Sequence, residues 1–381
     1  MCRLVSRMAS NDNAPKSVVI DFGCAYTKCG LSDIEQTAKV IPTVWSNHQE
    51  SSYYGDEAVT YRKIHPLKEI CNREVIDNWE AAEGFFEHLW QKEIKAETST
   101  YSLYLGARYL EKKGYREKLL EYFLEGMRVP GFYASNTGLL NLYGSGKQSG
   151  AVLDSGAYNS TVTVSHDGLL NEYQEVNLPL GGRDIDNQIR TLTNPNIEDR
   201  EFIQNIKSNK CRFEEKPKKD PLAPVLAPVA PVAEVEETMV EASPNYTLPD
   251  GSVVQIKPEL VTIPEILLYP NRIGVRRPGL HDLLYESMLR TDYEHRGELL
   301  ANLVTCGGNF LIPGFKSKVQ ELLSAMIPNN LKAKFDDVDN PQLLAWTGGT
   351  IVASLNSFQT NWITRAMLQE QGPSVILRKC L

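Results

Sequence analysis

The sequence predicts an α/β protein in which two similar domains face each other across a phosphate-binding cleft. The first observation is a repeated pattern, because residues 18–23 (VVIDFG) and 151–156 (AVLDSG) both run from three apolar residues into an aspartate and a glycine. The second observation is a set of amphipathic helical patterns between and after the two copies. Asp21 and Asp154 lie 133 residues apart. That distance is too long for one small repeat, so we expect two similar domains.

The second copy predicts a β-hairpin over residues 150–168. Thr161, Thr163 and Ser165 alternate with valines in its second strand. A tight turn with small residues exposes successive N–H groups, which form a concave site for an anion. Taken alone, this pattern is more often an ordinary hairpin than a binding site. The first copy, over residues 17–31, supports the binding interpretation.

Two such turns facing each other would make a two-sided clamp. Their N–H groups would hold phosphates, while Asp21 and Asp154 would hold a hydrated divalent metal. Lys28 adds a positive charge at the end of the first turn. The alternative for Lys28 is a solvated lysine at a strand end.

The segments between and after the two copies predict helices and further places where the backbone closely approaches a ligand or another helix. Residues 77–95, 116–126 and 139–142 carry apolar side chains at helical spacing, with their aromatic residues in the core. Gly181-Gly182 precedes Arg183, where the backbone could approach a ligand or a helix could simply begin. Residues 299–315 predict a strand that ends at Gly307-Gly308. Residues 348–349, a second Gly-Gly pair before an apolar helix, are interpreted as close helix packing.

Length, charge and composition narrow the class of protein. The chain has 381 residues, 42% apolar and 23% charged, which suits two globular domains. A net charge of −8 argues against non-specific nucleic-acid binding as its main role. No apolar run has the length of a membrane span, and the apolar stretch at the start is too short for a signal peptide.

The cysteines predict a reducing compartment. They are seven, scattered, and without CxxC spacing, at Cys2, Cys24, Cys29, Cys71, Cys211, Cys306 and Cys380. An odd, unpaired set of this kind disfavours a disulfide framework or a zinc site. We expect the cytosol or the nucleus.

The domain organisation follows from the repeat and from one change of composition. We expect a mobile tail over residues 1–15 and a first domain over 16–148, with a small inserted subdomain at about 42–76. The second domain covers 149–345, and the segment 346–381 returns to the first domain. A proline-rich stretch, 214–244, interrupts the second domain with Ala-Pro-Val units that cannot sustain a helix or a central strand. It is interpreted as a surface insertion, with a docking peptide as the alternative.

The residues resemble the actin family over most of the chain. The segments that carry the resemblance are VVIDFGCAYTKCG, SYYGDEA, GAVLDSG, NLPLGGRDID, YTLPDG, CGGNFLIPGF and the nearly continuous GGTIVASLNSFQTNWITRAMLQEQGPSVILRKCL. The resemblance implies an actin-like ATPase fold, with two ribonuclease-H-like domains around a cleft that takes ATP or ADP with Mg or Ca.

The resemblance also implies which residues contact the nucleotide. Asp21 and Asp154 would hold the metal through water, and Lys28 would pair with phosphate oxygens. One phosphate loop would comprise Gly23, Cys24, Ala25 and Tyr26, and the other Ser155, Gly156, Ala157 and Tyr158. The residues expected near the nucleoside are Gly182, Lys207, Gly307, Gly308 and Asn309.

Departures from the family pattern predict weak or absent hydrolysis. Thr137 stands where actins have a glutamine that positions the attacking water, Ala157 where they have a further metal-side aspartate, and Thr161 where a histidine helps to order the water. The first phosphate loop carries Cys24 and Ala25 in place of a serine and a glycine, and Tyr158 replaces a glycine. Phosphoryl transfer to water depends on in-line positioning, so we assign no catalytic residue and expect at most a very slow ATPase.

The favoured functional hypothesis is a divergent actin-related protein that acts as a structural subunit of an assembly. Residues 46–54 are short where actins have a longer subunit-contacting loop, and Arg276-Arg277 replaces an apolar plug, so an ordinary filament is disfavoured. Overall likeness points to nuclear chromatin-remodelling or histone-acetyltransferase complexes, with a long partner helix and actin as partners. We expect neither a membrane nor specific nucleic-acid reading. The alternative is a cytoskeletal protein that forms or caps filaments, of the dynactin type, or an ATPase of the sugar-kinase or chaperone type.

Overall fold

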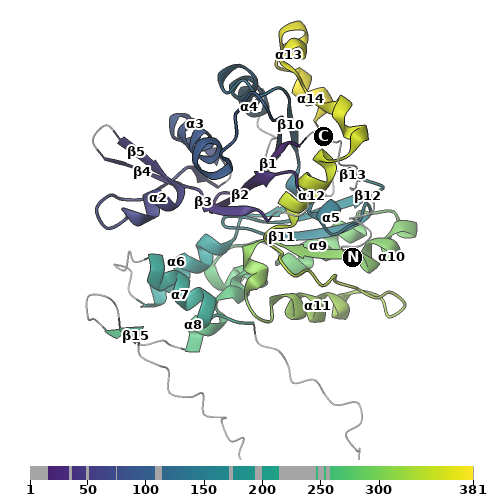
Figure 1. Cartoon of the computed structure of the whole chain (residues 1–381). Helices are drawn as coiled ribbons and strands as arrows, with labels where there is room; N and C mark the ends of the chain where they lie inside the picture. The colour runs from purple at the N-terminus through teal and green to yellow at the C-terminus, as the bar shows by residue number, and fades with distance from the viewer. Residues whose placement is uncertain are drawn as a thin grey trace, which may run out of the picture.

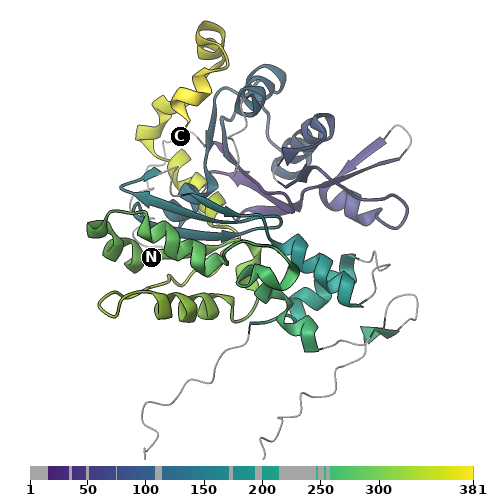
Figure 2. The ribbon, with the colours of Figure 1, turned by 180° about the vertical axis from the view of Figure 1, so that it is seen from behind.

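The structure is a computed structural model that describes residues 16–33, 37–48, 51–73, 75–107, 114–170, 175–193, 200–213, 246–247, 253–254 and 258–380. The expected tail, 1–15, and the proline-rich stretch, 214–244, lie outside the described residues. Figures 1 and 2 show two α/β halves, with the N-terminal sheet above and the second sheet below.

The first sheet has five strands in the order β10-β9-β1-β2-β3. Its strands are β1 (Val18–Phe22), β2 (Tyr26–Leu31), β3 (Lys39–Pro42), β9 (Leu103–Ala107) and β10 (Phe132–Ser135). The β1–β2 hairpin is antiparallel and pairs Asp21 with Lys28, whereas β9 and β10 run parallel to β1. The predicted first hairpin is therefore the centre of this sheet.

The second sheet repeats the same arrangement. Its order is β13-β12-β11-β17, with β14 also paired to β12. Its strands are β11 (Gly150–Ser155), β12 (Ser160–His166), β13 (Leu169–Leu170), β14 (Val176–Leu178) and β17 (Leu303–Cys306). The β11–β12 hairpin pairs antiparallel and β17 runs parallel to β11, as β9 does to β1. The repeated sequence pattern thus marks a repeated strand topology.

A small unit branches from the first sheet after β3. It contains a three-stranded sheet, β5-β4-β6, and one further two-stranded ribbon. Its elements are β4 (Val44–His48), β5 (Ser51–Tyr54), α2 (Gly55–Thr60), β6 (Lys68–Glu69), β7 (Cys71–Asn72) and β8 (Val75–Ile76). In the segment 46–54 that looked short in the sequence, residues 46–48 lie in β4 and 51–54 form β5, and these two strands pair antiparallel.

Helices cover both sheets (Figure 1). On the first half these are α3 (Trp79–His88) with the π-helical η1 (Leu89–Ile94), α4 (Tyr115–Glu121) with η2 (Tyr122–Gly126), α12 (Leu344–Ala353), η7 (Asn356–Asn361), α13 (Arg365–Gln371) and α14 (Val375–Lys379). On the second half they are α6 (Gly182–Thr193), α7 (Arg200–Asn209), α8 (Pro258–Thr262), η4 (Ile263–Leu267), η5 (Pro270–Ile273), α9 (Leu280–Leu289), α10 (Tyr293–Ala301), η6 (Gly308–Leu311) and α11 (Phe315–Met326). A separate two-stranded ribbon joins β15 (Tyr246–Thr247) to β16 (Val253–Val254).

Each sheet has its own hydrophobic core. The first core includes Trp90 and Phe123, both fully buried, together with Ile363 and Ile376 from the end of the chain. The C-terminal helices therefore pack beside α4 and β10, as both views show. The second core includes Phe202 and Phe315 and is a separate cluster.

Helices α5 (Thr137–Gly144) and α12 cross at a glycine contact where the two halves meet. A Cβ atom on Gly348 would lie 1.9 Å from the carbonyl oxygen of Leu140, and one on Gly144 would lie 2.3 Å from that of Leu344. Only glycine allows so close an approach. The expectation of close packing is confirmed, but the pair Gly348-Gly349 lies inside α12 and does not precede it. The strand expected within 299–315 is also shorter, because α10 continues to Ala301 before β17 begins.

No helix in the described part of the chain combines the length and the apolar character needed to cross a bilayer.

Candidate functional site

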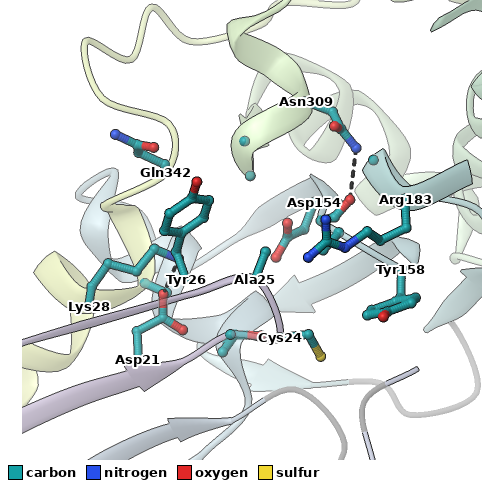
Figure 3. Close-up of a pocket in the computed structure, with 18 of the residues that line it drawn as sticks. Asp21, Cys24, Ala25, Tyr26, Lys28, Asp154, Tyr158, Arg183, Asn309 and Gln342 are labelled. Carbon is teal, nitrogen blue, oxygen red and sulfur yellow. Dashed lines mark hydrogen bonds and ion pairs between the residues drawn. The ribbon is translucent and has the colours of Figure 1, made fainter. Parts of the chain in front are cut away.

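The two aspartate turns lie on opposite walls of one cavity. Asp21 lies near the end of β1 and Asp154 near the end of β11, each two residues before a glycine. The cavity has a volume of about 470 Å³, and both turns line it. Figure 3 shows Asp21 and Lys28 on one side, with Asp154, Arg183 and Asn309 on the other.

The first wall carries an ion pair. Lys28 Nζ lies 2.9 Å from Asp21 Oδ2, and both side chains are largely buried. The turn between them holds Cys24 and Ala25, whose main-chain amides donate no hydrogen bond to another main-chain group of the described residues. Those amides and the lysine are the groups that an anion would use.

The second wall holds Asp154 through α5. Asn141 Nδ2 donates a 3.3 Å hydrogen bond to Asp154 Oδ2. Asn141 follows Thr137 by four residues, so both lie on the face of α5 that lines the cavity. Sequence reasoning missed Asn141, although this i, i+4 spacing was a signal that could have found it.

Ser155 does not line the cavity. Its side chain is fully buried, and its Oγ lies 2.8 Å from Ser160 Oγ and accepts a 3.0 Å hydrogen bond from Asn309 Nδ2. Asn309 also donates to the carbonyl oxygen of Gly156 at 2.8 Å. Ser155 therefore supports the second turn from behind, whereas the other predicted phosphate-loop residues face the cavity.

Glycines bring the backbone to the cavity at two decisive positions. A Cβ on Gly182 would lie 2.6 Å from Lys207 Nζ and 2.9 Å from Asn309 Oδ1. Gly307 has φ +89°, and a Cβ there would lie 2.6 Å from Asp154 Oδ1. A larger residue at Gly182 would fill the space beside Lys207 and Asn309, and one at Gly307 would displace Asp154.

The predicted nucleoside side also converges on the cavity. Lys207 of α7 donates to the carbonyl oxygen of Gly182 at 2.8 Å and pairs with Asp186 at 3.0 Å. Gln204 donates to the same carboxylate at 3.4 Å. Asp186 and Gln204 line the cavity but were not predicted. The sequence pattern that could have found Asp186 is its position four residues after Gly182 on an amphipathic helix.

The three positions at which the sequence departs from the actin pattern on the water side carry small side chains. Thr137 lines the cavity, and its buried hydroxyl has no hydrogen-bond partner in the described structure. Ala157 contributes only a methyl group. Thr161 is 2% exposed, lies in the middle of the second sheet opposite Asp154, and does not line the cavity.

Three side chains, Glu69, Tyr158 and Arg183, form what we call the cross-cleft bridge. The Tyr158 hydroxyl donates to Glu69 Oε2, and Arg183 Nη2 pairs with Glu69 Oε1. Glu69 belongs to β6 of the small unit, whereas Tyr158 and Arg183 belong to the second half. The bridge therefore joins the two walls at the edge of the cavity that Tyr158 and Arg183 line.

Burial and charge at the bridge shift the pKa values of its members. Burial, followed by the hydrogen bond with Glu69, raises the pKa of the Tyr158 phenol. Burial lowers the pKa of Arg183, but the charges of Glu69 and Asp186 outweigh it and the net pKa is raised. The bridge thus holds a neutral phenol and a guanidinium around one carboxylate at neutral pH.

A comparison with protein families identifies the architecture. A family model described as actin matches residues 13–381. The chain belongs to the actin family. The predicted α/β class and actin-like ATPase fold are confirmed by this match and by the paired sheets. Actin-family proteins typically bind a nucleotide with a divalent cation in such a cleft.

The residues of this actin-family cavity fit such a ligand. Asp21 and Asp154 offer carboxylate oxygens, which Mg²⁺ and Ca²⁺ prefer. Lys28, the amides of the first turn and the open glycines suit phosphates. All predicted binding residues except Ser155 line one cavity in the structure. Their role in nucleotide binding stays a prediction, since their placement alone does not measure binding.

Proposed function

We propose that this actin-family protein binds ATP or ADP with a divalent cation and hydrolyses it very slowly or not at all. The observation that carries the proposal is the contrast within one cavity. The ion-pair and glycine features that suit phosphates are present, whereas Ala157 offers only a methyl group and the Thr137 hydroxyl is short and buried. Positioning is the main contribution of a protein to phosphoryl transfer to water, so a site without it binds more than it catalyses.

The bound nucleotide would then act as a structural link between the halves. Its phosphates would touch both aspartate turns, so it would bind the closed, folded form and not the unfolded chain. A ligand of this kind stabilises the native state in proportion to the logarithm of its concentration over its Kd. The divalent cation would neutralise phosphate charge next to Asp21 and Asp154.

The binding experiment measures displacement of a fluorescent ATP analogue by ATP and ADP in Mg²⁺. We expect saturable binding that Lys28→Ala and Asp154→Ala each weaken by about tenfold or more, because one charge-assisted contact contributes roughly 1.5–3 kcal/mol. Phosphate release should stay near background at saturating ATP. Rapid turnover would refute slow hydrolysis, and absent binding would refute the nucleotide role.

Thr137→Gln tests the catalytic part directly. Thr137 lines the cavity at the start of α5, and its hydroxyl is buried without a partner in the described structure, so a longer amide could reach a water in the cavity. We expect phosphate release to rise by roughly tenfold in single-turnover measurements, since one orienting group commonly contributes at least that factor. Thr347→Gln, at a half-buried position of α12 that does not line the cavity, is the matched control and should leave the rate unchanged.

We further propose that the protein is a structural subunit of a larger assembly, in a nuclear chromatin-remodelling or histone-acetyltransferase complex. Arg276 and Arg277 support this proposal, because both are exposed on a turn that packs through Val275 against the second core. Burying two unpaired arginines in a filament contact would be costly. A long partner helix and actin are the expected partners, and the nucleus is the favoured compartment over the cytoplasm.

A cytoskeletal role in forming or capping filaments is the second candidate. The observation that favours it is the C-terminal segment, which resembles actins almost continuously in sequence and packs Ile363 and Ile376 into the first core. Affinity purification of the tagged full chain from its native cell distinguishes the two. Chromatin-complex subunits would support the first proposal, whereas motor or filament proteins, together with pelleting in ATP and salt, would support the second.

A further inference from the structure

A cluster of two histidines and a glutamate lies outside the nucleotide cavity. The cluster consists of His166, His295 and Glu298, and none of the three lines that cavity. One ligand atom from each, a ring nitrogen or a carboxylate oxygen, lies within 4.8 Å of the others. His166 ends β12, while His295 and Glu298 lie on α10, at the edge of the second half away from α6 and α7 (Figures 1 and 2).

The local fold brings these three side chains close together. His295 and Glu298 are three residues apart in α10, so they share one face of the helix. That helix is fixed by Leu299 and Leu300, which are almost fully buried in the second core. The rings of His166 and His295 lie with centroids 4.0 Å apart, and His166 Nε2 lies 3.6 Å from Glu298 Oε2.

The nitrogen–oxygen spacing in this cluster is close to that of a metal centre. Zn²⁺ binds imidazole nitrogen and carboxylate oxygen at about 2.0–2.2 Å, which puts neighbouring ligand atoms of a tetrahedron about 3.3 Å apart. The 3.6 Å separation already approaches that value, and small side-chain rotations would bring the third ligand into range. Three protein ligands leave one position open, and the cluster is partly exposed, so water can fill it.

A second carboxylate supports the arrangement from the other side. Asp167 Oδ2 lies 3.6 Å from His166 Nδ1, opposite the ring nitrogen that faces Glu298. Asp167 is itself held in the β12–β13 turn, where its φ is 49° and its main-chain N–H donates to Ser149 Oγ at 3.0 Å. A carboxylate behind a ligating histidine fixes the tautomer that presents the other nitrogen to a metal.

No competing cation neutralises Glu298 in the described part of the chain. The neighbouring Arg296 donates to the carbonyl oxygens of Thr291 and Leu289, at 2.9 and 2.7 Å, and so turns back along its own helix. Glu298 has only His166 as an ion-pair partner among the described residues. The carboxylate thus faces the two imidazoles.

We propose that His166, His295 and Glu298 form a binding site for a borderline divalent cation, with Zn²⁺ as the natural occupant. Imidazole and carboxylate ligands select Zn²⁺ over Mg²⁺ and Ca²⁺, which prefer oxygen alone. The cation would tie the β12–β13 turn to α10, and its open position would accept water. This site is separate from the nucleotide cavity and does not depend on the proposed function.

The test is calorimetric titration of the full chain with Zn²⁺ in excess Mg²⁺. We expect one tight equivalent. His295→Ala should weaken it by more than roughly 100-fold, since even loss of a second-shell partner costs about 10–100-fold. Glu298→Gln should also weaken binding severely, and because that side chain is 47% exposed it should not disturb folding. Asp167→Asn, which tolerates the same positive φ, should cause an intermediate loss.

The matched control removes a histidine from an equally close pair. The rings of His48 and His65 stack with centroids 4.1 Å apart, but no carboxylate completes a metal-binding group with them among the described residues. His48→Ala should therefore leave the tight Zn²⁺ equivalent unchanged. The proposal would be overturned if the wild-type protein bound no tight equivalent of Zn²⁺, or if His295→Ala and Glu298→Gln both kept the wild-type affinity. Any bound zinc would then be assigned to the cysteines or the cavity carboxylates.

Discussion

The cross-cleft bridge predicts that Tyr158→Phe will open the nucleotide cleft. The substitution keeps the ring that lines the cavity and removes only the hydroxyl that donates to Glu69. Arg183 keeps its contact with Glu69. The change therefore isolates one hydrogen bond between the small unit and the second half.

The expected effect is about 1.5 kcal/mol. A hydrogen bond to a charged group contributes roughly 1.5–3 kcal/mol, and the lower end applies here because Glu69 and Arg183 keep 27% and 18% of their side-chain exposure. That energy corresponds to a change of about tenfold in an equilibrium constant. Because the bond spans the cleft, only the closed form loses this stabilisation. We therefore expect the equilibrium constant for opening to rise about tenfold.

The assay is the release of a fluorescent ATP analogue from the preloaded protein, followed after mixing with excess ATP. Tyr158→Phe should release the analogue up to about tenfold faster. Glu69→Gln should release it faster still, because it weakens the pair with Arg183 as well and leaves Arg183 with Asp186, at 3.4 Å, as its remaining ion-pair partner among the described residues.

Tyr122→Phe is the matched control. The Tyr122 hydroxyl donates at 2.9 Å to the carbonyl oxygen of Glu83, which lies in the same half. This variant also loses a tyrosine hydroxyl hydrogen bond, here to a neutral carbonyl, without loosening the cleft, so it should lose some stability and keep the wild-type release rate. Unchanged release from Tyr158→Phe, or equal acceleration in Tyr122→Phe, would refute the bridge as a closing contact.

Three further predictions concern the cavity, the buried histidines and the helix crossing. Cys24, the one described cysteine that is not buried, should react with a small maleimide faster than the other described cysteines, and Mg-ATP should slow that reaction at least severalfold in peptide mass spectrometry; equal labelling with and without nucleotide would place the ligand elsewhere. Burial lowers the pKa values of His88 and His281, so the folded protein binds fewer protons than the unfolded chain, and the free energy of unfolding in urea should fall as the pH drops from about 7 through 6.5; a flat profile would contradict this. Gly348→Ala should cost about 3 kcal/mol or more in thermal unfolding, because its Cβ would meet a main-chain oxygen at 1.9 Å, whereas Gly297→Ala, whose Cβ would meet only a leucine methyl at 3.9 Å, should be neutral or slightly stabilising.

Sequence reasoning found the two aspartate turns because their geometry is local. A strand, a small-residue turn and a second strand leave a readable pattern within about ten residues, and the structure places both turns as the central hairpins of equivalent sheets. Ser155 shows the limit of that reasoning. Its position in the motif suggested a ligand contact, but alternation along β11 turns its side chain toward Ser160 and Asn309.

The sequence by itself determined the repeated hairpins, the two cores and membership of the actin family, since each depends on patterns between near neighbours or on overall likeness. Only the tertiary structure decided which distant side chains meet. Glu69 reaches Tyr158 and Arg183 across 89 and 114 residues of chain, and His166 reaches α10 across the fold. Such contacts depend on how helices and sheets pack, and the one across the cleft also depends on the junction of the halves, where α5 and α12 cross at their glycines. No short segment records that geometry.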